Sequence, residues 1–489
     1  MNKLFKIGVA LSCAMLLTGC RSDFLDPQPQ GQVSSTQLAS NPDAISKLLD
    51  GVYLTYASYK AGGTTNHDDF GLMGLYAASD LMTNDEAQMI NHWFGGFYNF
   101  TGQLVTNSRT LSVWRAYYSQ IFNLNKIISS IEASGSTSAE SNYVLGQALV
   151  MRAYSYDRLT RFYTFSYKGH ESDLAVPLTK GGETTGIPRS TVSEVYASVV
   201  ADMERGISLL NGYSRGSDKS KVDAKVAKAL AADLYLWMGN YEKAATYANE
   251  ARTGYSLMSR SSYLSTGFSE LSNTEAMWGF DHTSLTTGVY ASFFSHWDST
   301  NNGYAGLLGV YKLIDKRLYD AIPSTDYRKL NFNGASSASY TFNDKTKTYP
   351  AYTNFKFKDP SFFEGDYIYL RSSLLYYIEA ESLARQGKEP QARQVLYEIT
   401  SARDSGYTLS SKSGADLINE IILQKRIEMW GEGYAWSDQK RLGVPLVRNY
   451  TGTNHPSFGR VDQEVNNARW RFQIPQLEIN NNENIVQNP

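Results

Sequence analysis

Two glycine-interrupted stretches of this 489-residue chain place flat aromatic rings beside side chains that hydrogen-bond hydroxyl groups. They span residues 84–100 and 290–304 and are the most aromatic segments outside the expected helices. A sugar ring offers an apolar C–H face, which an aromatic ring desolvates, and a rim of hydroxyls, which Asn, Asp and His side chains bind. The residue types therefore predict saccharide recognition by these loops. The predicted ligand-binding residues are Asn84, Asp85, Trp93, Phe97, Tyr98, Tyr290, His296, Trp297, Asn301 and Tyr304.

Aromatic side chains in loops have a second common use, which is to anchor the loop to the core. Most of the 35 Tyr, 21 Phe and 8 Trp residues are expected to pack inside the protein in this way. Trp93 and Trp297 are the favoured ligand contacts, because a tryptophan in a polar loop is costly unless it is covered or used.

Residue patterns for catalysis and metal binding are weak in this sequence. Residues 212–216 match G-x-S-x-G, but Ser214 follows an expected helix rather than a strand, so a polar loop is favoured. No HExxH or paired CxxC motif occurs, so zinc is not expected. Residues 67–69 (HDD) and 298–303 (DSTNNG) lack the full oxygen spacing of a calcium site. We predict no enzyme activity, no metal and no cofactor, and a structural calcium stays an unsupported alternative.

Charged residues near the C-terminal end of the expected helical region have the spacing of an ion-pair network. They are Arg426, Glu428, Glu432, Asp438 and Arg441. The same residue types occur in catalytic sites, but on helical spacing they are more simply explained as pairs that lock the last helix. The formal net charge of the whole chain is −2, and this lack of basic excess predicts that no nucleic acid is bound.

The N-terminal segment has the pattern of a lipoprotein signal. Lys3 and Lys6 precede a short apolar run at residues 7–17, and residues 17–20 (LTGC) resemble a bacterial lipobox. We predict a signal peptide at residues 1–19, lipidation of Cys20 and a polar tether at residues 20–40. Acyl chains would then hold the protein on a membrane surface without a spanning helix.

A repeated pattern of small residues predicts a scaffold of helix pairs. The first copy contains Ala232, Gly239 and Ala244, and 148 positions later the second contains Ala380, Gly387 and Ala392. Alanine allows two helices to approach closely, and glycine ends the first helix of each pair in the left-handed conformation. The spacing is typical of tetratricopeptide units, which stack on one another because one pair cannot bury its apolar face alone. Two ordinary helical hairpins are the alternative.

The predicted fold is mostly α, with a tetratricopeptide-like scaffold and an interleaved loop-rich lobe that binds the ligand. Residues 41–489 are expected to form one domain. The scaffold is assigned mainly to residues 41–60, 109–255 and 367–447, and the loop-rich lobe to residues 61–108 and 256–366. The expected helices span residues 43–60, 111–132, 143–165, 192–210, 309–321, 367–386, 390–402 and 414–431.

Several short motifs, in order along the chain, resemble one family. They are the lipobox followed by residues 23–26 (DFLD), then residues 146–154 (GQALVMRAY), 371–381 (RSSLLYYIEAE), 426–433 (RIEMWGEG), 474–480 (IPQLEIN) and 487–489 (QNP). Together they are similar to the RagB/SusD family of Bacteroidetes outer-membrane lipoproteins, over nearly the whole chain.

This resemblance implies a non-enzymatic, lipid-anchored protein on the outer-membrane surface. Such proteins bind oligosaccharides and cooperate with a SusC-like TonB-dependent transporter, and the loops matching residues 79–100 and 282–304 carry the ligand. Within the same family, peptide capture is an alternative. From other classes, a secreted glycosidase or esterase and a helical-repeat adaptor without a small ligand also stay open.

Overall fold

The computed structural model describes residues 42–342 and 344–488. The predicted signal peptide at residues 1–19, the lipidation site at Cys20 and the tether at residues 20–40 lie outside the described residues. Within the described ranges, none of the helices combines the length and the apolar character needed to cross a membrane.

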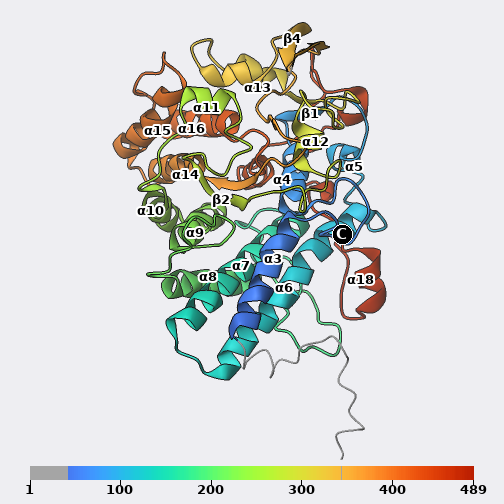
Figure 1. The fold of residues 1–489 in the computed structure, drawn as a ribbon, viewed down its shortest axis with the longest axis vertical. Helices are drawn as coiled ribbons and strands as arrows, with labels where there is room; N and C mark the ends of the chain where they lie inside the picture. The colour runs from blue at the N-terminus through green and yellow to red at the C-terminus, as the bar shows by residue number, and fades with distance from the viewer. Residues whose placement is uncertain (1–41, 343, 489) are drawn as a thin grey trace, which may run out of the picture.

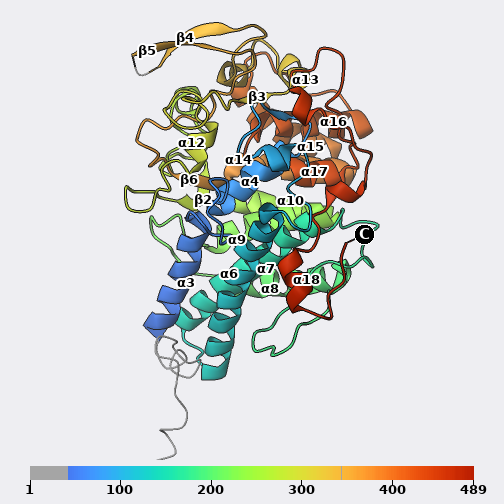
Figure 2. The same cartoon turned by 90° about the vertical axis from the view of Figure 1, so that its right-hand side faces the viewer.

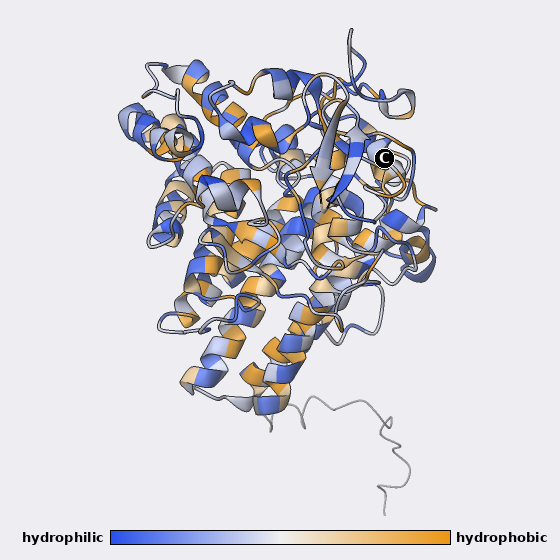
Figure 3. Cartoon of the chain, turned by 45° about the horizontal axis from the view of Figure 1, so that its top comes forward, coloured by the Kyte–Doolittle hydropathy of each residue, from blue (hydrophilic) through white to orange (hydrophobic). Residues whose placement is uncertain are grey.

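Four long helices form the lower part of the molecule, as Figure 1 shows. They are α3 (Pro42–Ala57), α6 (Ser108–Ser134), α7 (Ala139–Tyr163) and α8 (Val192–Leu209). At the start of α8, the Thr191 hydroxyl and the Glu194 carboxylate reciprocally cap backbone N–H groups, a box that the sequence motif indicates. Figure 3 shows mixed hydrophilic and hydrophobic residues along the projecting helices, as amphipathic helices require.

The two predicted helix pairs are present, and they pack directly against each other. The first is α9 (Ala224–Met238) with α10 (Tyr241–Arg252), and the second is α14 (Ser372–Arg385) with α15 (Glu389–Arg403). Gly239 and Gly387 follow the first helix of each pair with φ of 78° and 76°. Helix α10 lies against α14, so pairs far apart in the sequence form one continuous stack (Figure 2). Helices α16 (Gly414–Glu428) and α17 (Ala435–Arg441) extend it.

Short antiparallel sheets connect the segments that surround this helical stack. Strand β1 (Glu86–Gln88) pairs with β3 (Lys312–Ile314), β2 (Ala276–Phe280) with β6 (Tyr367–Arg371), and β4 (Ala338–Phe342) with β5 (Lys345–Tyr349). The β1–β3 pairing joins the two loop-rich segments, because Glu86 faces Ile314 across the sheet. The remaining short elements are α5 (Gly95–Tyr98), α11 (Arg260–Leu264), α12 (Phe293–Trp297), α13 (Lys316–Asp320), η2 (Tyr327–Asn331), η3 (Ser457–Gly459), η4 (Ala468–Trp470) and α18 (Gln476–Asn481).

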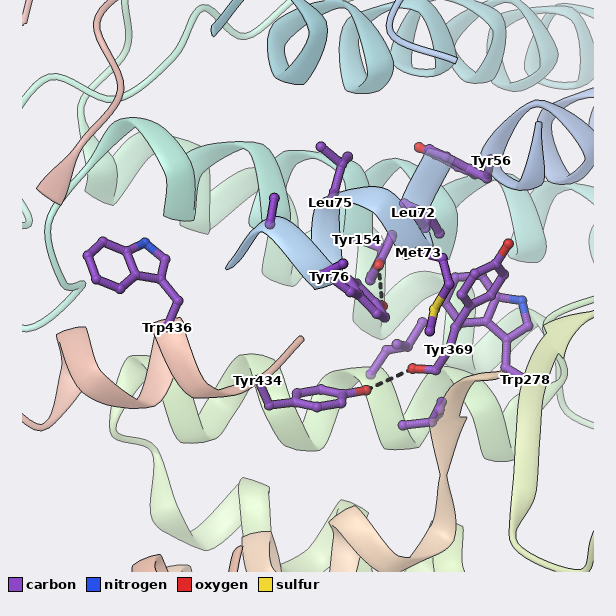
Figure 4. Packing of buried hydrophobic residues seen from close by; sticks show 14 of the residues in the cluster. Tyr56, Leu72, Met73, Leu75, Tyr76, Tyr154, Trp278, Tyr369, Tyr434 and Trp436 are labelled. Atoms are coloured by element: carbon purple, nitrogen blue, oxygen red, sulfur yellow. Dashed lines mark hydrogen bonds between the residues drawn. The ribbon is translucent and has the colours of Figure 1, made fainter. Parts of the chain in front are cut away.

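Helix α4 (Gly71–Leu81) corrects the expectation that residues 61–108 are loop-like. All eleven residues of α4 are buried. A helix covered on every side has no polar face, so its sequence lacks the amphipathic period by which helices are recognised. Figure 4 shows its packing: Tyr76 meets the hydroxyl of Tyr154, with 2.5 Å between the two oxygens, beside Trp278 and Tyr369.

Two other predicted helices are wrong in part. Residues 309–321 form strand β3 and the short α13, and residues 367–371 form strand β6 before α14 begins. In both places the chain pairs with a distant strand, because β3 meets β1 and β6 meets β2. Such pairing overrides local helical preference and leaves no signal in a short window of sequence.

The predicted ion-pair network exists in part: Asp438 pairs with Arg441, and arginines from other segments pair with Glu428 and Glu432. Glu428 is fully buried and lies among the guanidinium groups of Arg328, Arg371 and Arg403, with N···O distances of 3.2 to 3.3 Å. Glu432 pairs with Arg371 at 2.6 Å. Arg426 is not part of this group and pairs with Asp85, whereas Arg441 pairs with Asp438 at 2.8 Å. Since these charges are buried and satisfied by one another, they hold β6, α15 and α16 together.

Candidate functional site

Tyr304 lies at the centre of a group of aromatic side chains that come from three separate segments. Its hydroxyl lies 2.7 Å from Nδ1 of His67, and its ring stacks on His296 with 4.6 Å between centroids. The rings of His92 and Tyr290 approach it at 4.9 and 6.2 Å. We call His67, His92, Trp93, Tyr290 and Tyr304 the Tyr304 cluster; all five are partly or well exposed.

Trp93 presents the largest ring of the Tyr304 cluster. It stacks on His67 at 5.2 Å between centroids, with 15° between the planes. Arg109 fixes this segment, because its guanidinium donates to the Trp93 carbonyl and pairs with Asp68 at 2.6 Å. A stacked pair held on its backbone side is a rigid platform, and a rigid platform loses little entropy when a ligand ring lies on it.

Burial determines the charge of the histidines in this cluster. It lowers the pKa of His67 and of His92, so both imidazoles are neutral at neutral pH. The Nδ1 atom of a neutral His67 can accept a hydrogen bond from the Tyr304 hydroxyl. The surface of the cluster is therefore uncharged and amphipathic, with flat rings and a few polar atoms.

Exposed apolar side chains border the Tyr304 cluster on two neighbouring segments. Met89 and Ile90 are 39% and 42% exposed, and Leu307 and Leu308 are 61% and 53% exposed. The segments are adjacent because the Met89 N–H donates to the Tyr311 carbonyl at 3.0 Å, which continues the β1–β3 ladder. An apolar surface gathered in this way is typical of an interaction site rather than of a random surface.

Four predicted ligand-binding residues are buried, and this corrects the expectation that they contact a ligand. They are Phe97, Tyr98, His296 and Trp297, each 3% exposed or less. The Trp297 indole donates to Glu86 at 2.8 Å and lies parallel to Phe293, so it anchors α12 to the core. The Tyr98 hydroxyl lies 2.7 Å from Nδ1 of the buried His455. Loop aromatics of this kind satisfy both the apolar ring and the polar tip inside the protein.

Asn84 and Asp85 also lie elsewhere than predicted. Asn84 donates a hydrogen bond to the Pro445 carbonyl at 2.9 Å, and the Asp85 carboxylate accepts one from the Nε of Arg426 at 2.9 Å. Both line a separate pocket beside α13, α16 and α17. Asn301 donates weakly to the carbonyls of Asp359 and Ser361, each at 3.3 Å, and so fixes a neighbouring loop. Of the ten predicted residues, the structure gathers Trp93, Tyr290 and Tyr304 into one group that is at least partly exposed.

Two histidines of the cluster were not among the predicted ligand-binding residues. His92 could have been included because it precedes Trp93, but His67 lies 237 positions from Tyr304 and no local signal connects them. The alternative of a cation site at residues 67–69 is not supported: Asp68 pairs with Arg109, and Asp69 accepts from the N–H of Gly62 at 2.7 Å. In the part of the chain that the structure describes, no group of three or more acidic, His or Cys side chains is placed to hold a metal.

Comparison with protein-family models gives two matches that together span most of the chain. Residues 23–236 match a model described as "Starch-binding associating with outer membrane", and residues 309–489 match the SusD family model. The chain belongs to the SusD/RagB family. This confirms the resemblance inferred from the sequence motifs. Among the curated proteins, no significant match is found.

Solved structures of three similar proteins share the fold over nearly the full length. A SusD-like carbohydrate-binding protein from Bacteroides vulgatus has a TM-score of 0.79 at 25% identity, covering 91% of this chain and 97% of that one. A SusD superfamily protein from Bacteroides thetaiotaomicron has a TM-score of 0.75 at 22% identity, covering 92% and 100%. Surface glycan-binding protein A from the same species has a TM-score of 0.69 at 17% identity, covering 91% and 98%.

The SusD-family fold confirms the predicted fold class, which is mostly α with a tetratricopeptide-like scaffold. Members of the family are non-enzymatic binding proteins, and the chain is therefore not an enzyme. The G-x-S-x-G match fits this conclusion, because Ser214 lies in an exposed loop between α8 and α9 and not on a strand-to-helix turn.

Proposed function

We propose that this SusD-family chain binds oligosaccharides through the Tyr304 cluster and delivers them to a SusC-like TonB-dependent transporter at the outer-membrane surface. The observation that carries the proposal is the partly exposed, uncharged platform formed by Trp93, His67 and Tyr304. Stacking on such rings suits the apolar face of a sugar, while neighbouring imidazole and phenol groups suit its hydroxyls. Affinity should be modest, because sugar hydroxyls exchange bonds to water for bonds to protein at small net gain.

Affinity electrophoresis in gels containing plant, microbial and host polysaccharides tests the binding step. At least one polysaccharide should retard the protein, and Trp93→Ala should reverse most of the retardation. Phe122→Ala is the matched control, because Phe122 is 52% exposed on α6 and takes no part in the cluster. Equal retardation of the two variants would remove the Tyr304 cluster from the proposal.

A lipid anchor on Cys20 is the proposed means of surface attachment. Its support is the lipobox at residues 17–20 together with membership of the SusD/RagB family. Labelled palmitate should be incorporated into the wild-type protein and not into Cys20→Ala. Co-purification of the lipidated chain with a TonB-dependent barrel from outer membranes would support the transporter partnership, and recovery of the chain alone under gentle extraction would count against it.

Peptide binding is the second candidate function, and one observation favours it. The apolar border made by Met89, Ile90, Leu307 and Leu308 offers contacts to hydrophobic side chains that a sugar does not need. Mass spectrometry of ligand that co-purifies with the protein separates the two candidates. Leu308→Asp should reduce retention of a peptide strongly and retention of a polysaccharide only slightly.

A further inference from the structure

A pocket of about 340 Å³ lies beside α13, α16 and α17, and none of its lining residues belongs to the Tyr304 cluster. Its volume is within the range of sites that hold small organic ligands. Its lining includes the apolar side chains of Leu318, Ile422, Leu423 and Leu442. The proposed saccharide site does not use this pocket, whereas Arg426 and Asp438, which also form ion pairs, line it.

Two arginines, Arg317 and Arg426, also line the pocket. The Nε of Arg426 donates to Asp85 at 2.9 Å, and its Nη2 donates to the other carboxylate oxygen. Arg317 donates a hydrogen bond from Nε to Asp315 at 3.0 Å and another from Nη2 to the Val447 carbonyl at 2.8 Å. Among the residues that the structure describes, the Nη1 group of each arginine has no hydrogen-bond partner.

The acceptors that line the same pocket are already engaged. Asn84 Oδ1 accepts from the Val447 N–H at 2.7 Å, and Gln439 Oε1 accepts from the Asn84 N–H at 3.2 Å. Asp438 is paired with the buried Lys425 at 2.8 Å. The pocket therefore has guanidinium N–H donors that no hydrogen bond within the described residues uses, and such donors suit an anionic group of the ligand.

We infer that this pocket is a second binding site, for a carboxylate attached to a compact apolar group. The carboxylate would accept charge-assisted hydrogen bonds from Arg317 and Arg426, and the apolar group would lie against the leucine and isoleucine side chains of the lining. The C-terminal residue of a peptide and a free branched-chain acid both have this chemistry. The site goes beyond the proposed saccharide binding, because a neutral sugar has neither a carboxylate nor a branched alkyl group.

Ligand-observed NMR titration of the full chain in detergent tests the inference with three probes. N-acetyl-L-leucine mimics a peptide C-terminus, 4-methylpentanoate is the free acid, and N-acetyl-L-leucinamide has no carboxylate. At least one acid should bind, and the amide should bind at least about tenfold more weakly. Binding of N-acetyl-L-leucine alone identifies a peptide terminus as the source, and binding of 4-methylpentanoate alone identifies a free acid. Equal binding of amide and acids, or binding of none, overturns the proposal.

Two variants assign the binding to this pocket without disturbing the core. Ala321 is an exposed lining residue, so Ala321→Trp should occupy the pocket and abolish binding, whereas Ser324→Trp, exposed and outside the lining, should leave it unchanged. Arg317→Gln should weaken acid binding about tenfold and leave the weak amide binding as it was. Acid binding that survives Ala321→Trp overturns the assignment. Polysaccharide retention by Ala321→Trp should equal that of the wild type, which keeps this test independent of the saccharide site.

Discussion

The Tyr304 hydroxyl and Nδ1 of His67 lie 2.7 Å apart, although 237 positions separate the two residues in the sequence. This hydrogen bond ties the segment before α4 to the segment after α12. It also orients the His67 ring on which Trp93 stacks. The proposed binding platform therefore depends on a long-range contact and not on either aromatic loop alone.

The first prediction concerns this hydrogen bond. Tyr304→Phe keeps the ring but removes the donor, and it should lower the free energy of unfolding by about 1 kcal/mol. Polysaccharide retention should fall several-fold, because the His67–Trp93 stack loses its restraint. Tyr340→Phe is a matched control, since it removes the 2.9 Å bond from Tyr340 to Asn333, which is not in the cluster. If both variants retain polysaccharide like the wild type, the bond does not support the site.

The second prediction separates the two tryptophans that the sequence analysis treated alike. Trp297→Phe removes the indole bond to Glu86, whose other carboxylate oxygen already lacks a partner in the described residues. The variant should lose about 2–4 kcal/mol of stability, because it leaves a small cavity and an unsatisfied buried acceptor. Retention by the folded protein should not change. Denaturant unfolding measures the stability, and affinity electrophoresis measures the polysaccharide retention. Trp93→Ala should show the opposite pattern, with reduced retention and little change in stability.

The third prediction is a loss of stability in acid. Burial alone raises the pKa of Asp233, but the guanidinium groups of Arg161 and Arg158 outweigh it and bring the pKa to about 2. Glu381 has a pKa of about 2 for the same reason, with Arg441 as its main partner. A carboxylate whose pKa is lower in the folded than in the unfolded state stabilises the fold at any pH above its unfolded-state pKa. This stabilisation is lost as the pH falls through the folded-state pKa, so stability should drop between about pH 4.5 and 2.

A single variant measures how much one of these carboxylates contributes to the loss of stability in acid. Each of the two carboxylates should contribute about 2 kcal/mol to the drop. Urea unfolding of the wild type and of Asp233→Asn at pH 7, 4.5 and 3 measures it. The variant should start less stable and lose less between pH 4.5 and 3. Parallel curves for the two proteins would show that Asp233 does not titrate in this range.

The fourth prediction compares two glycines in helical surroundings. Gly239 has φ of 78°, and Gly239→Ala should cost about 1 kcal/mol because an L-residue is strained in this conformation. Gly51 lies inside α3, and apart from its chain neighbours and the backbone of its own helix no atom lies within 4 Å of the place that a Cβ would occupy, so Gly51→Ala should stabilise by about 0.5–1 kcal/mol. Thermal unfolding of both variants provides the measurement. A Gly239→Ala protein as stable as the wild type would mean that the turn tolerates another conformation.

Periodic helices and their caps were predictable from the sequence because their signals are local. The alanines and glycines of the two repeats, the capping box at Thr191 and the amphipathic pattern of α6 each act within a few residues. Helix α4 and strands β3 and β6 were not predictable in this way. The first is buried on all sides, and the strands form only where a distant partner is available.

The sequence by itself determined the family, the helical scaffold and the chemical character of the two aromatic loops. Only the tertiary structure decided which rings are available to a ligand, because burial depends on what the rest of the chain places around each ring. Trp93 and Trp297 have similar sequence surroundings, yet one lies on His67 near the surface and the other is fully buried against Phe293 and Glu86. An aromatic side chain favours both environments, so its exposure is fixed by long-range packing and not by its own type.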